Sequence, residues 1–297
     1  IFRIQSQILR FFREFLLNRG FIEIQPPGII ASASEGGADL FKIPYFERDA
    51  FLAQSPQLYK QMCAISFEKV FTVVPVWRAE KFNTPVHLNE SRQMDVEIAF
   101  ASNEDAMKLL EEVFVHILSE VKTHCNRELE VLGRDLVVPS LPLKRVTYTE
   151  TVDLLNSRGE KIDWGEDFTK PQERLLMSLV GEEAFFVGDW PTVQKPFYVL
   201  PYEDRPEVCR AFDLIYGGLE ISSGTQRVHF PELLRRQILA KGLKPEDFEH
   251  YIRCFAFGAP PHSGWSIGLE RLTMKVTGMD NIRESCMFPR DRNRLVP

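Results

Sequence analysis

The sequence lacks the signatures of several large protein classes. Its five cysteines form no CxxC pair, so neither a zinc site nor a disulfide framework is indicated. No apolar run approaches the roughly 20 residues that a membrane helix needs, and the start IFRIQSQILRFF does not have the pattern of a signal peptide. The patterns GxxxxGK[ST], GxGxxG after a strand and HExxH are also absent, which argues against a P-loop, a Rossmann site and a zincin protease. We therefore expect a soluble cytoplasmic protein, in which any ATP site is of another kind.

Basic residues are also outnumbered by acidic ones, 36 to 42. The formal net charge is -6, which argues against a basic coat for nucleic acid, because nonspecific affinity comes from many Lys and Arg contacts to phosphates. Two local basic clusters remain, residues 235–244 and 289–294, and such charges more often form a solvated face. With 44% apolar residues in 297, the chain can bury a large core, and we expect one large domain.

Hydrophobic spacing predicts an α+β fold. Apolar residues at helical spacing predict a first helix over residues 4–16, ending near Gly20, and a long helix from Glu104 to His124. From residue 196 onward, short strand-like runs joined by tight turns favour an antiparallel sheet with helices packed on it. Residues 126–195 are polar and weakly periodic, and we interpret them as an inserted or peripheral region without functional residues.

Two alternating segments, FTVVPVWRAE and QMDVEIAF, predict an antiparallel hairpin. The alternation places Arg78 and Glu80 on one face of the first strand, and Asp95 and Glu97 on one face of its partner. The apolar residues of the second strand point to the opposite face: Met94, Val96, Ile98 and Phe100. One face of this hairpin is therefore expected to carry chemistry and the other to pack in the core.

A further helix is predicted to begin at Ser55 as N-cap and Pro56 as first residue, which would place Gln57, Lys60 and Gln61 on one face. The histidines are scattered, and His262 in GAPPHSG is interpreted as a loop residue held by its own hydrogen bonds. No nucleophile elbow accompanies them, so hydrolase functions are disfavoured.

Asp213 and Glu220 flank a YGG turn that would join two strands and point both carboxylates toward one hard cation. Magnesium with a triphosphate fits such a pair. Taken singly, these acids are more often ordinary turn-flanking residues, and a strand arginine such as Arg78 is more often an ion-pair residue than a phosphate ligand. Together, the charges would be costly to bury without a ligand. The set comprises Arg78, Glu80, His87, Asp95, Asp213, Glu220, Arg227 and Arg271.

Seven motifs in order resemble those of class II aminoacyl-tRNA synthetases, in particular the aspartate enzymes of archaeal and eukaryotic type. RGFIEIQPPGII resembles motif one with Pro27 as its proline, VWRAEKFNTPVHLNE resembles motif two, and IGLERL resembles motif three. SEGGADLF resembles the loop that closes over the amino acid, QSPQLYKQ the substrate-recognition helix, and GLEISSGTQR the metal and side-chain site. The end, FPRDRNRLVP, resembles the family terminus, so the resemblance spans nearly the whole chain.

The resemblance implies a class II catalytic domain over residues 1–297, with a six-stranded antiparallel sheet flanked by helices and a homodimer built around Pro27. It implies ATP- and Mg²⁺-dependent formation of aspartyl-adenylate, followed by transfer of aspartate to the 3'-terminal adenosine of tRNA. Nothing in the chain resembles the N-terminal OB-fold domain that reads the anticodon. Two alternatives therefore stay open: a paralogue that adenylates aspartate for another acceptor, such as ammonia, and a nonenzymatic scaffold.

The same resemblance implies roles for individual residues, with Arg78 and Arg271 as the catalytic pair. Arg78 would hold the α-phosphate and the substrate carboxylate, His87 the outer phosphates, and Arg271 the adenine and γ-phosphate. The residues implied to bind ATP are Arg78, Ala79, Glu80, Val86, His87, Leu88, Glu220, Gly268, Leu269, Glu270 and Arg271. Those implied to bind aspartate are Glu35, Gln57, Leu58, Tyr59, Lys60, Arg78, Asp95, Ser223 and Arg227. Those implied to bind magnesium are Asp213, Glu220 and Ser223.

Lys60 separates the aspartate enzymes from their asparagine relatives, in which this position is typically not lysine. Lys60 and Arg227 would bind the side-chain carboxylate of aspartate. If the neutral amide of asparagine took its place, the two cations would be left unneutralised in a buried site. Glu35 and Asp95, with Gln57, would receive the ammonium group. The chain departs from the family pattern at four positions that bear on ATP binding: Val86, Ser91, Thr225 and Ser266.

Overall fold

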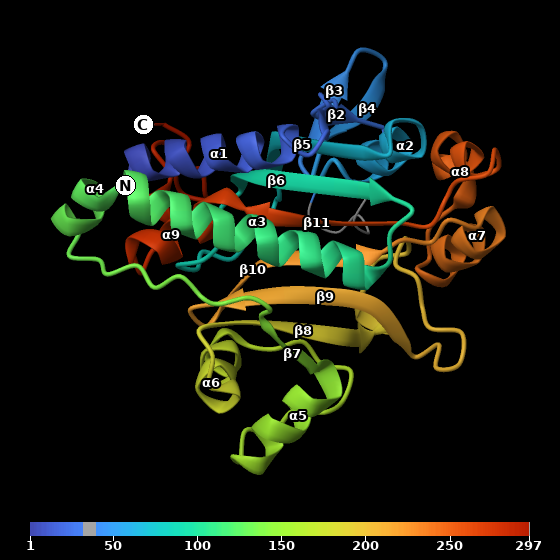
Figure 1. Cartoon of the computed structure of the whole chain (residues 1–297). Helices are drawn as coiled ribbons and strands as arrows, with labels where there is room; N and C mark the ends of the chain where they lie inside the picture. Colours follow the sequence, from blue (N-terminus) through green and yellow to red (C-terminus); the bar gives the residue numbers. More distant parts are fainter. Residues whose placement is uncertain (32–39, 297) are drawn as a thin grey trace.

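The computed structural model describes residues 1–31 and 40–296, and its centre is one large twisted sheet (Figure 1). Eight strands lie in the order β1-β5-β6-β11-β10-β9-β8-β7. In that order they are Ile22–Glu23, Lys69–Trp77, Glu90–Ala99, His262–Gly268, Leu219–Gln226, Val208–Tyr216, Ala184–Pro191 and Lys144–Thr147. A separate sheet in the order β2-β4-β3 comprises Ile29–Ile30, Arg48–Leu52 and Lys42–Tyr45.

The sheet confirms the α+β class but corrects the predicted strand number. The six inner strands, from β5 to β8, are antiparallel to their neighbours, as predicted. The two outer strands, β1 and β7, pair in parallel with β5 and β8, so the sheet has eight strands and is mixed. These outer strands have two and four residues, too few for an alternating pattern to be read from the sequence.

Helices flank this sheet along both faces. They are α1 (Phe2–Leu17), α2 (Gln57–Phe67), α3 (Asn103–His124), α4 (Asn126–Val131), α5 (Tyr148–Ser157), α6 (Lys170–Val180), α7 (Pro231–Ala240), α8 (Glu249–Phe255) and α9 (Leu269–Thr277). The predicted long helix is confirmed as α3, whose N-cap Ser102 forms a capping box with Asp105. The first helix ends at Leu17, and Gly20 adopts a left-handed conformation just beyond it, with φ +79°. Helix α2 begins at Gln57, one residue later than predicted.

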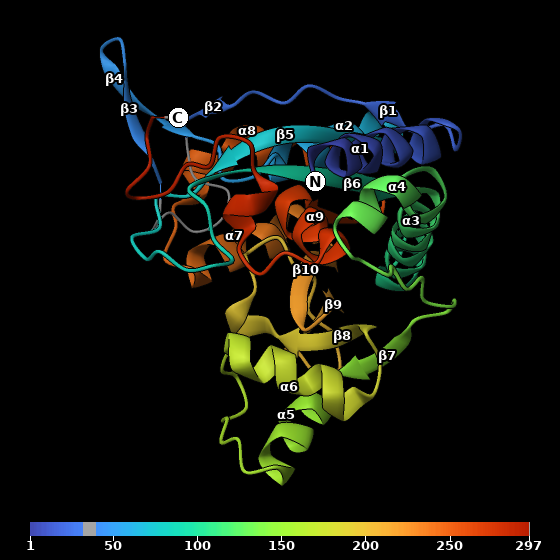
Figure 2. The same cartoon turned by 90° about the vertical axis from the view of Figure 1, so that its left-hand side faces the viewer.

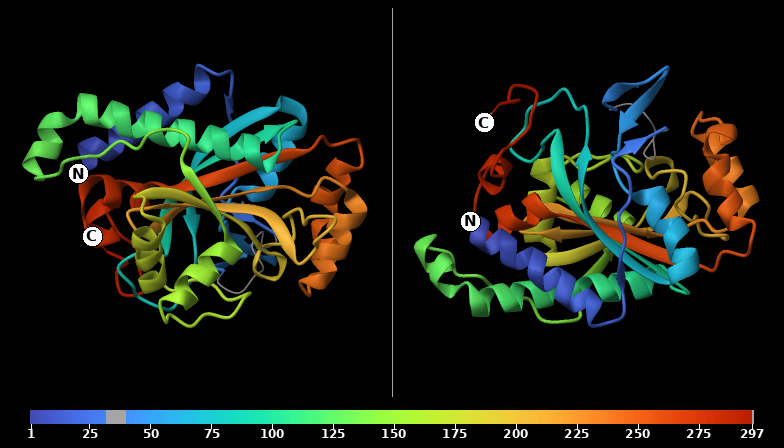
Figure 3. Two further views of the ribbon diagram at one scale, coloured as in Figure 1. Left: turned by 60° about the horizontal axis from the view of Figure 1, so that its bottom comes forward. Right: turned by 90° about the horizontal axis from the view of Figure 1, so that it is seen from above.

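The main core lies between one face of the sheet and helices α1 and α3, which run side by side (Figures 1 and 3). Met94, Val96 and Ile98 point into it, as the alternation of the hairpin predicts. Phe100 does not, because β6 ends at Ala99 and the chain turns with a φ of +56° that leaves the Phe100 side chain exposed.

A second core occupies the opposite face, where α5, α6, α7 and α8 cover β8 and β9. Figure 2 shows α5 and α6 at the end of the molecule remote from α1. Residues 126–195 are therefore peripheral only in part, since they also supply β7 and the buried strand β8. None of the described helices is long and apolar enough to cross a membrane.

Candidate active site

A row of polar side chains crosses four strands on the face opposite α3. Asp213 on β9 pairs with Ser223 on β10, Ser223 with Ser266 on β11, and Ser266 with Asp95 on β6. Residues directly opposite each other in antiparallel strands share a face of the sheet. The four side chains therefore line one surface, although Asp95 and Ser266 lie 171 residues apart in sequence.

Four buried charges meet at one end of this row. Lys60 of α2 places its Nζ 2.7 Å from Asp95 Oδ1 and 3.6 Å from Glu97 Oε2. Arg227 donates from Nε and Nη2 to the two oxygens of Glu97, at 2.9 and 3.1 Å. All four side chains are at most 3% exposed. Two cations and two carboxylates thus neutralise each other away from water.

Glu97 holds this arrangement together. Burial raises the pKa of its carboxyl, but Arg227 and Lys60 outweigh that effect and hold the pKa below its ordinary value. The Glu97 carboxylate lies across β11 at Gly264, where an added Cβ would come within 2.1 Å of Oε2. Glycine at this position therefore gives the carboxylate the room it occupies.

A hydrogen-bond chain fixes the neighbouring amides. Gln61 Oε1 accepts from Gln57 Nε2 at 2.9 Å and from the Tyr251 hydroxyl at 3.0 Å. His262 Nδ1 lies 2.9 Å from the carbonyl of Pro260, which can only accept, so His262 Nε2 accepts from the Gln61 amide at 2.9 Å. His262 is a buried strand residue rather than a loop residue, which corrects the prediction, and the predicted common face of Gln57, Lys60 and Gln61 is confirmed.

The two middle residues of the row, Ser223 and Ser266, line a cavity of about 180 Å³. It is lined by Arg78, Glu80, Val86, His87, Leu88, Ser91, Gln93, Glu220, Ile221, Ser222, Ser223, Ser266, Gly268, Glu270, Arg271 and Ile282. Arg78 and Glu80 reach it from the loop after β5, which ends at Trp77, so their predicted place within a strand was wrong. The cavity gathers most of the residues implied to bind ATP.

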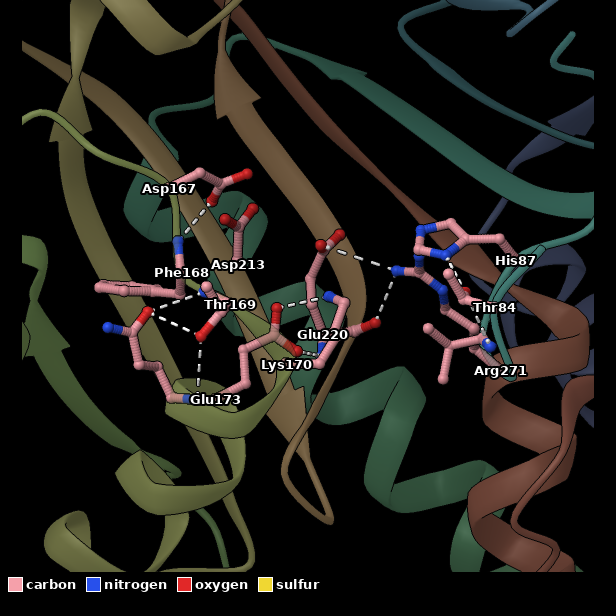
Figure 4. A network of polar contacts seen from close by, with 12 residues as sticks. Thr84, His87, Asp167, Phe168, Thr169, Lys170, Glu173, Asp213, Glu220 and Arg271 are labelled. Atoms are coloured by element: carbon pink, nitrogen blue, oxygen red, sulfur yellow. Dashed lines mark hydrogen bonds and ion pairs between the residues drawn. The ribbon is translucent and has the colours of Figure 1, made fainter. Parts of the chain in front are cut away.

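Arg271 and His87 lie next to each other in the lining of this cavity (Figure 4). Arg271 Nη1 donates to the carbonyl oxygen of Glu220 at 2.9 Å, and Nη2 lies 3.5 Å from His87 Nε2. His87 Nδ1 is 2.6 Å from the hydroxyl of Thr84. Burial, followed by the charges of Arg271, Lys170 and Arg78, lowers the pKa of His87 to about 4. At neutral pH this ring is therefore a neutral hydrogen-bonding group rather than a cation.

The β9–β10 hairpin carries the two acids of the predicted metal site. Gly217 and Gly218 both have positive φ, at 56° and 69°, and form the predicted tight turn. Asp213 Oδ2 lies 2.9 Å from Lys195 Nζ, whereas Oδ1 is buried and has no hydrogen-bond partner among the described residues. The Glu220 carboxylate points toward Arg271 (Figure 4), with Oε2 3.6 Å from Nη1.

Opposite pKa shifts distinguish these acids. Burial, reinforced by the charge of Glu220, raises the pKa of Asp213 despite the opposing effect of Lys195. Burial also raises the pKa of Glu220, but Arg271 and nearby lysines outweigh it and hold the pKa below its ordinary value. The described residues contain no group of three or more His, Cys, Asp and Glu side chains that would hold a metal. Mg²⁺, however, is usually held by one or two carboxylates together with substrate phosphates, so the Asp213–Glu220 pair fits it.

Three residues of this half come from the region that we interpreted as lacking function. Lys195 contacts Asp213, and its Nζ lies 3.9 Å from the ring centre of Trp190. Lys170 and Glu173 form a pair at 2.5 Å beside Glu220, whose backbone N–H donates to Glu173 Oε2 at 3.4 Å (Figure 4). The sequence offered no signal for them, because isolated charges in a polar segment resemble a solvated surface.

Other predicted residues lie in different places. Glu35 lies outside the described residues. Leu58 and Leu269 place their side chains in the two cores rather than in the cavity. Pro27 is exposed between β1 and β2. Glu270 lines the cavity and accepts from the Arg92 N–H, and burial raises the pKa of its carboxyl to about 7.

Curated relatives match the whole chain. The Aspartate–tRNA(Asp/Asn) ligase of Methanopyrus kandleri is 51% identical over 299 residues, covering 100% of this chain and 69% of that protein. The Aspartate–tRNA(Asp) ligase of Pyrococcus furiosus is 50% identical over 303 residues, again covering 100% of this chain and 69% of that protein. Both relatives are thus longer than this chain.

Solved structures give the same picture. An asparaginyl-tRNA synthetase from Pyrococcus horikoshii, complexed with asparaginyl-adenylate, superposes with a TM-score of 0.96 at 35% identity and covers 100% of this chain and 69% of that one. An aspartyl-tRNA synthetase from Entamoeba histolytica gives 0.88 at 38% identity, covering 100% and 59%. The model of the tRNA synthetases class II (D, K and N) matches residues 1–292. The buried charges, the cavity beside them and this match over almost the entire length place the chain in the class II tRNA synthetase family.

Proposed function

We propose that this chain carries the catalytic region of an aspartate–tRNA ligase. It would use ATP and Mg²⁺ to form aspartyl-adenylate and then transfer aspartate to the 3'-terminal adenosine of tRNA. Relatives near 50% identity named aspartate–tRNA ligases support the substrate, since they align along the whole chain. The observation that carries the proposal is the buried Lys60, held within 3.6 Å of two carboxylates beside Arg227.

The buried charges suit the three charged groups of aspartate. In the proposed complex the substrate carboxylate side chain contacts Lys60 and Arg227, and its ammonium takes the place of Lys60 at Asp95. Gln57 assists, because its amide is oriented by Gln61 and leaves the oxygen for the ammonium. Each buried charge then keeps an opposite partner, which a neutral asparagine side chain cannot provide.

ATP would occupy the neighbouring cavity. Arg78 and Arg271 supply fixed cations for the phosphates, and the neutral His87 offers a hydrogen bond to the outer phosphates. Asp213, Glu220 and Ser223 would hold Mg²⁺, which neutralises charge on the phosphates when bound. The orphaned Asp213 Oδ1 supports this assignment, because a buried carboxylate oxygen without a partner is otherwise unfavourable.

The reaction needs positioning more than proton transfer. The α-carboxylate of aspartate attacks the α-phosphorus in line, and pyrophosphate leaves. The tRNA hydroxyl then attacks the carbonyl carbon of the mixed anhydride, and AMP leaves with loss of the hydroxyl proton. Arginines placed where charge develops lower the barrier without reorganising during the reaction. The abundance of guanidinium groups and the neutral histidine agree with this chemistry.

The remaining partners follow from the family relation. We propose a homodimer around the exposed Pro27, binding of the tRNA acceptor end at the cavity mouth, and a cytoplasmic location. The domain assignment, a class II catalytic domain over residues 1–297, is part of the same proposal.

The deciding experiment is aspartate-dependent exchange of pyrophosphate into ATP, followed by product analysis with tRNA and, separately, with ammonia. We expect exchange with aspartate and not with asparagine, and esterified tRNA as the product. Asparagine formed from ammonia would instead indicate the paralogue, and no exchange would indicate a scaffold.

A further inference from the structure

The loop after β5 is held from outside by the end of the chain. This loop, residues 78–89, lines the cavity with Arg78, His87 and Leu88. Residues 281–294, here called the C-terminal strap, follow α9. The strap runs along the 78–89 loop, as the adjacent teal and red segments of Figures 2 and 3 show. Backbone bonds join the two: Ile282 N donates to the Pro85 carbonyl at 2.8 Å, and Asn89 N donates to the Arg290 carbonyl at 2.8 Å.

Two arginines of the strap donate hydrogen bonds to carbonyl groups of the loop. Arg283 Nη1 donates to the Thr84 carbonyl at 3.0 Å, and Nη2 bonds the Asn83 side chain. Arg292 Nη1 donates to the Lys81 carbonyl at 2.9 Å. Within the basic cluster at residues 289–294, the Arg292 side chain and the Arg290 backbone carbonyl therefore both bond the loop.

Asp291 fixes the central arginine. Its Oδ2 accepts from Arg283 Nε at 2.7 Å and from Arg294 Nη1 at 2.5 Å, and its Oδ1 accepts from Asn293 N at 2.9 Å. The side chains of Asp291 and Arg283 are only 3% and 13% exposed. Such a buried, charge-assisted pair has defined geometry, so the Arg283 guanidinium is oriented toward the loop before any ligand binds.

A continuous path leads from this pair to the cavity. Asp291 orients Arg283, Arg283 holds the carbonyl of Thr84, and the hydroxyl of Thr84 lies 2.6 Å from His87 Nδ1. On the apolar side, Ile282 packs with Val86 and Leu88 of the loop. Leu219 of β10 and Met274 of α9 complete this apolar cluster, so the strap shares the packing of the loop with them.

We propose that Arg283 and Asp291 are positioning residues that pre-order the 78–89 loop for the nucleotide. They contact no substrate themselves and act through Thr84 and His87. The inference rests on the proposed function only for the identity of the ligand, ATP. The ordering of the loop itself is a property of the free protein.

The test uses Arg283→Gln and Asp291→Asn in the full chain, with Arg205→Gln as matched control. Arg205 also forms an ion pair, 2.9 Å from Asp189, but far from the loop in sequence and outside the cavity. Hydrogen exchange is measured without substrates on peptides covering 78–90 and 281–292. We expect exchange about tenfold faster in both variants, the effect of losing about one charge-assisted hydrogen bond, with α3 unchanged. Wild-type exchange in Arg283→Gln and Asp291→Asn overturns the proposal.

Kinetics give the second readout. We expect KM for ATP to rise about tenfold in Arg283→Gln and KM for aspartate to stay within about twofold. An equal rise in both constants would mean general distortion and would also overturn the proposal. If the wild-type protein exchanged no pyrophosphate, the proposed function would fail, whereas the hydrogen-exchange result would still decide the role of the strap. A melting curve of each variant confirms that it folds, and Asp291→Asn, which keeps the shape of the side chain, serves if Arg283→Gln does not.

Discussion

Replacing Lys60 by methionine tests the centre of the proposed amino-acid site. The substitution keeps most of the side-chain volume and removes a cation that is 1% exposed and 2.7 Å from Asp95. Removing one partner of a buried ion pair typically costs about 3–5 kcal/mol, because the other charge stays buried. Glu97 retains both bonds from Arg227, and Asp95 retains the Ser266 hydroxyl at 3.1 Å. We therefore expect the lower limit, about 3 kcal/mol of lost stability.

Urea denaturation measures this loss, and a compensating variant explains it. Lys60→Met combined with Asp95→Asn removes one cation and one anion together, so the Glu97–Arg227 pair remains balanced. Replacing a buried pair by neutral groups is often close to neutral, and we expect the double variant to lie within about 1 kcal/mol of the wild type. A double variant as unstable as Lys60→Met would show that the methylene packing of Lys60, rather than its charge, holds α2 on the sheet.

Activity gives the more direct measurement. Loss of a buried contact between cation and carboxylate weakens binding by roughly 3 kcal/mol, which corresponds to about 100-fold in KM for aspartate. KM for ATP should change less than about twofold, because Lys60 does not line the nucleotide cavity. Lys122→Met, at an exposed pair near the end of α3, is the control. An unchanged KM for aspartate in Lys60→Met would refute the assigned role.

Three further predictions concern the sheet and the second half of the site. Burial raises the pKa of Glu270 from its ordinary value of 4.5 to about 7 in the folded chain. Between these pH values the folded chain binds more protons than the unfolded chain, so stability falls as the pH rises through them, by up to roughly 3 kcal/mol. Glu270→Gln should therefore be more stable than the wild type in urea at pH 8, and the difference should disappear at pH 4; a constant difference would contradict this. Gly264→Ala should lower the free energy of unfolding by about 3 kcal/mol, because the added Cβ would lie 2.3 Å from the Val96 carbonyl and 2.1 Å from Glu97 Oε2. A melting temperature equal to that of the wild type would refute the packing argument. Glu220→Gln should raise the Mg²⁺ concentration needed for half-maximal pyrophosphate exchange about tenfold or more, whereas an unchanged requirement would exclude it as a ligand.

Short-range patterns predicted the parts of the fold that depend on neighbouring residues. The alternation of residues 94–98 located the core face of β6, and the helical spacing of apolar residues located α3, because both signals lie within a few residues of chain. The alternation misled where a strand ended earlier than its pattern: β5 stops at Trp77, so Arg78 enters the cavity from a loop.

Long-range partners left no local signal. Lys195, which lies in the connection between β8 and β9, contacts Asp213, and Arg283 contacts Thr84 from 199 residues away. Neither contact follows from periodicity or spacing. Glu97 was placed on the correct face of its strand, but its bidentate partner, Arg227, is 130 residues distant. The resemblance to a known family gathered Asp95, Asp213 and Arg227 into one site through motifs rather than through geometry, but it did not point to Lys195, Arg283 or Glu97.

The pairing of Lys60 with Asp95 gives a physical reason for the choice of aspartate. In the structure these two charges are partners at 2.7 Å, so a substrate that inserts between them must replace both halves of the pair. Aspartate does so in the proposed complex, with its ammonium at Asp95 and its side-chain carboxylate at Lys60. Asparagine replaces only the first half and leaves a buried ammonium against a neutral amide, an arrangement that a buried site disfavours strongly. Both substrates break the ion pair that the free protein makes, so this cost cancels in the comparison, and the preference for aspartate comes from the bound state, in which aspartate alone gives Lys60 an opposite charge.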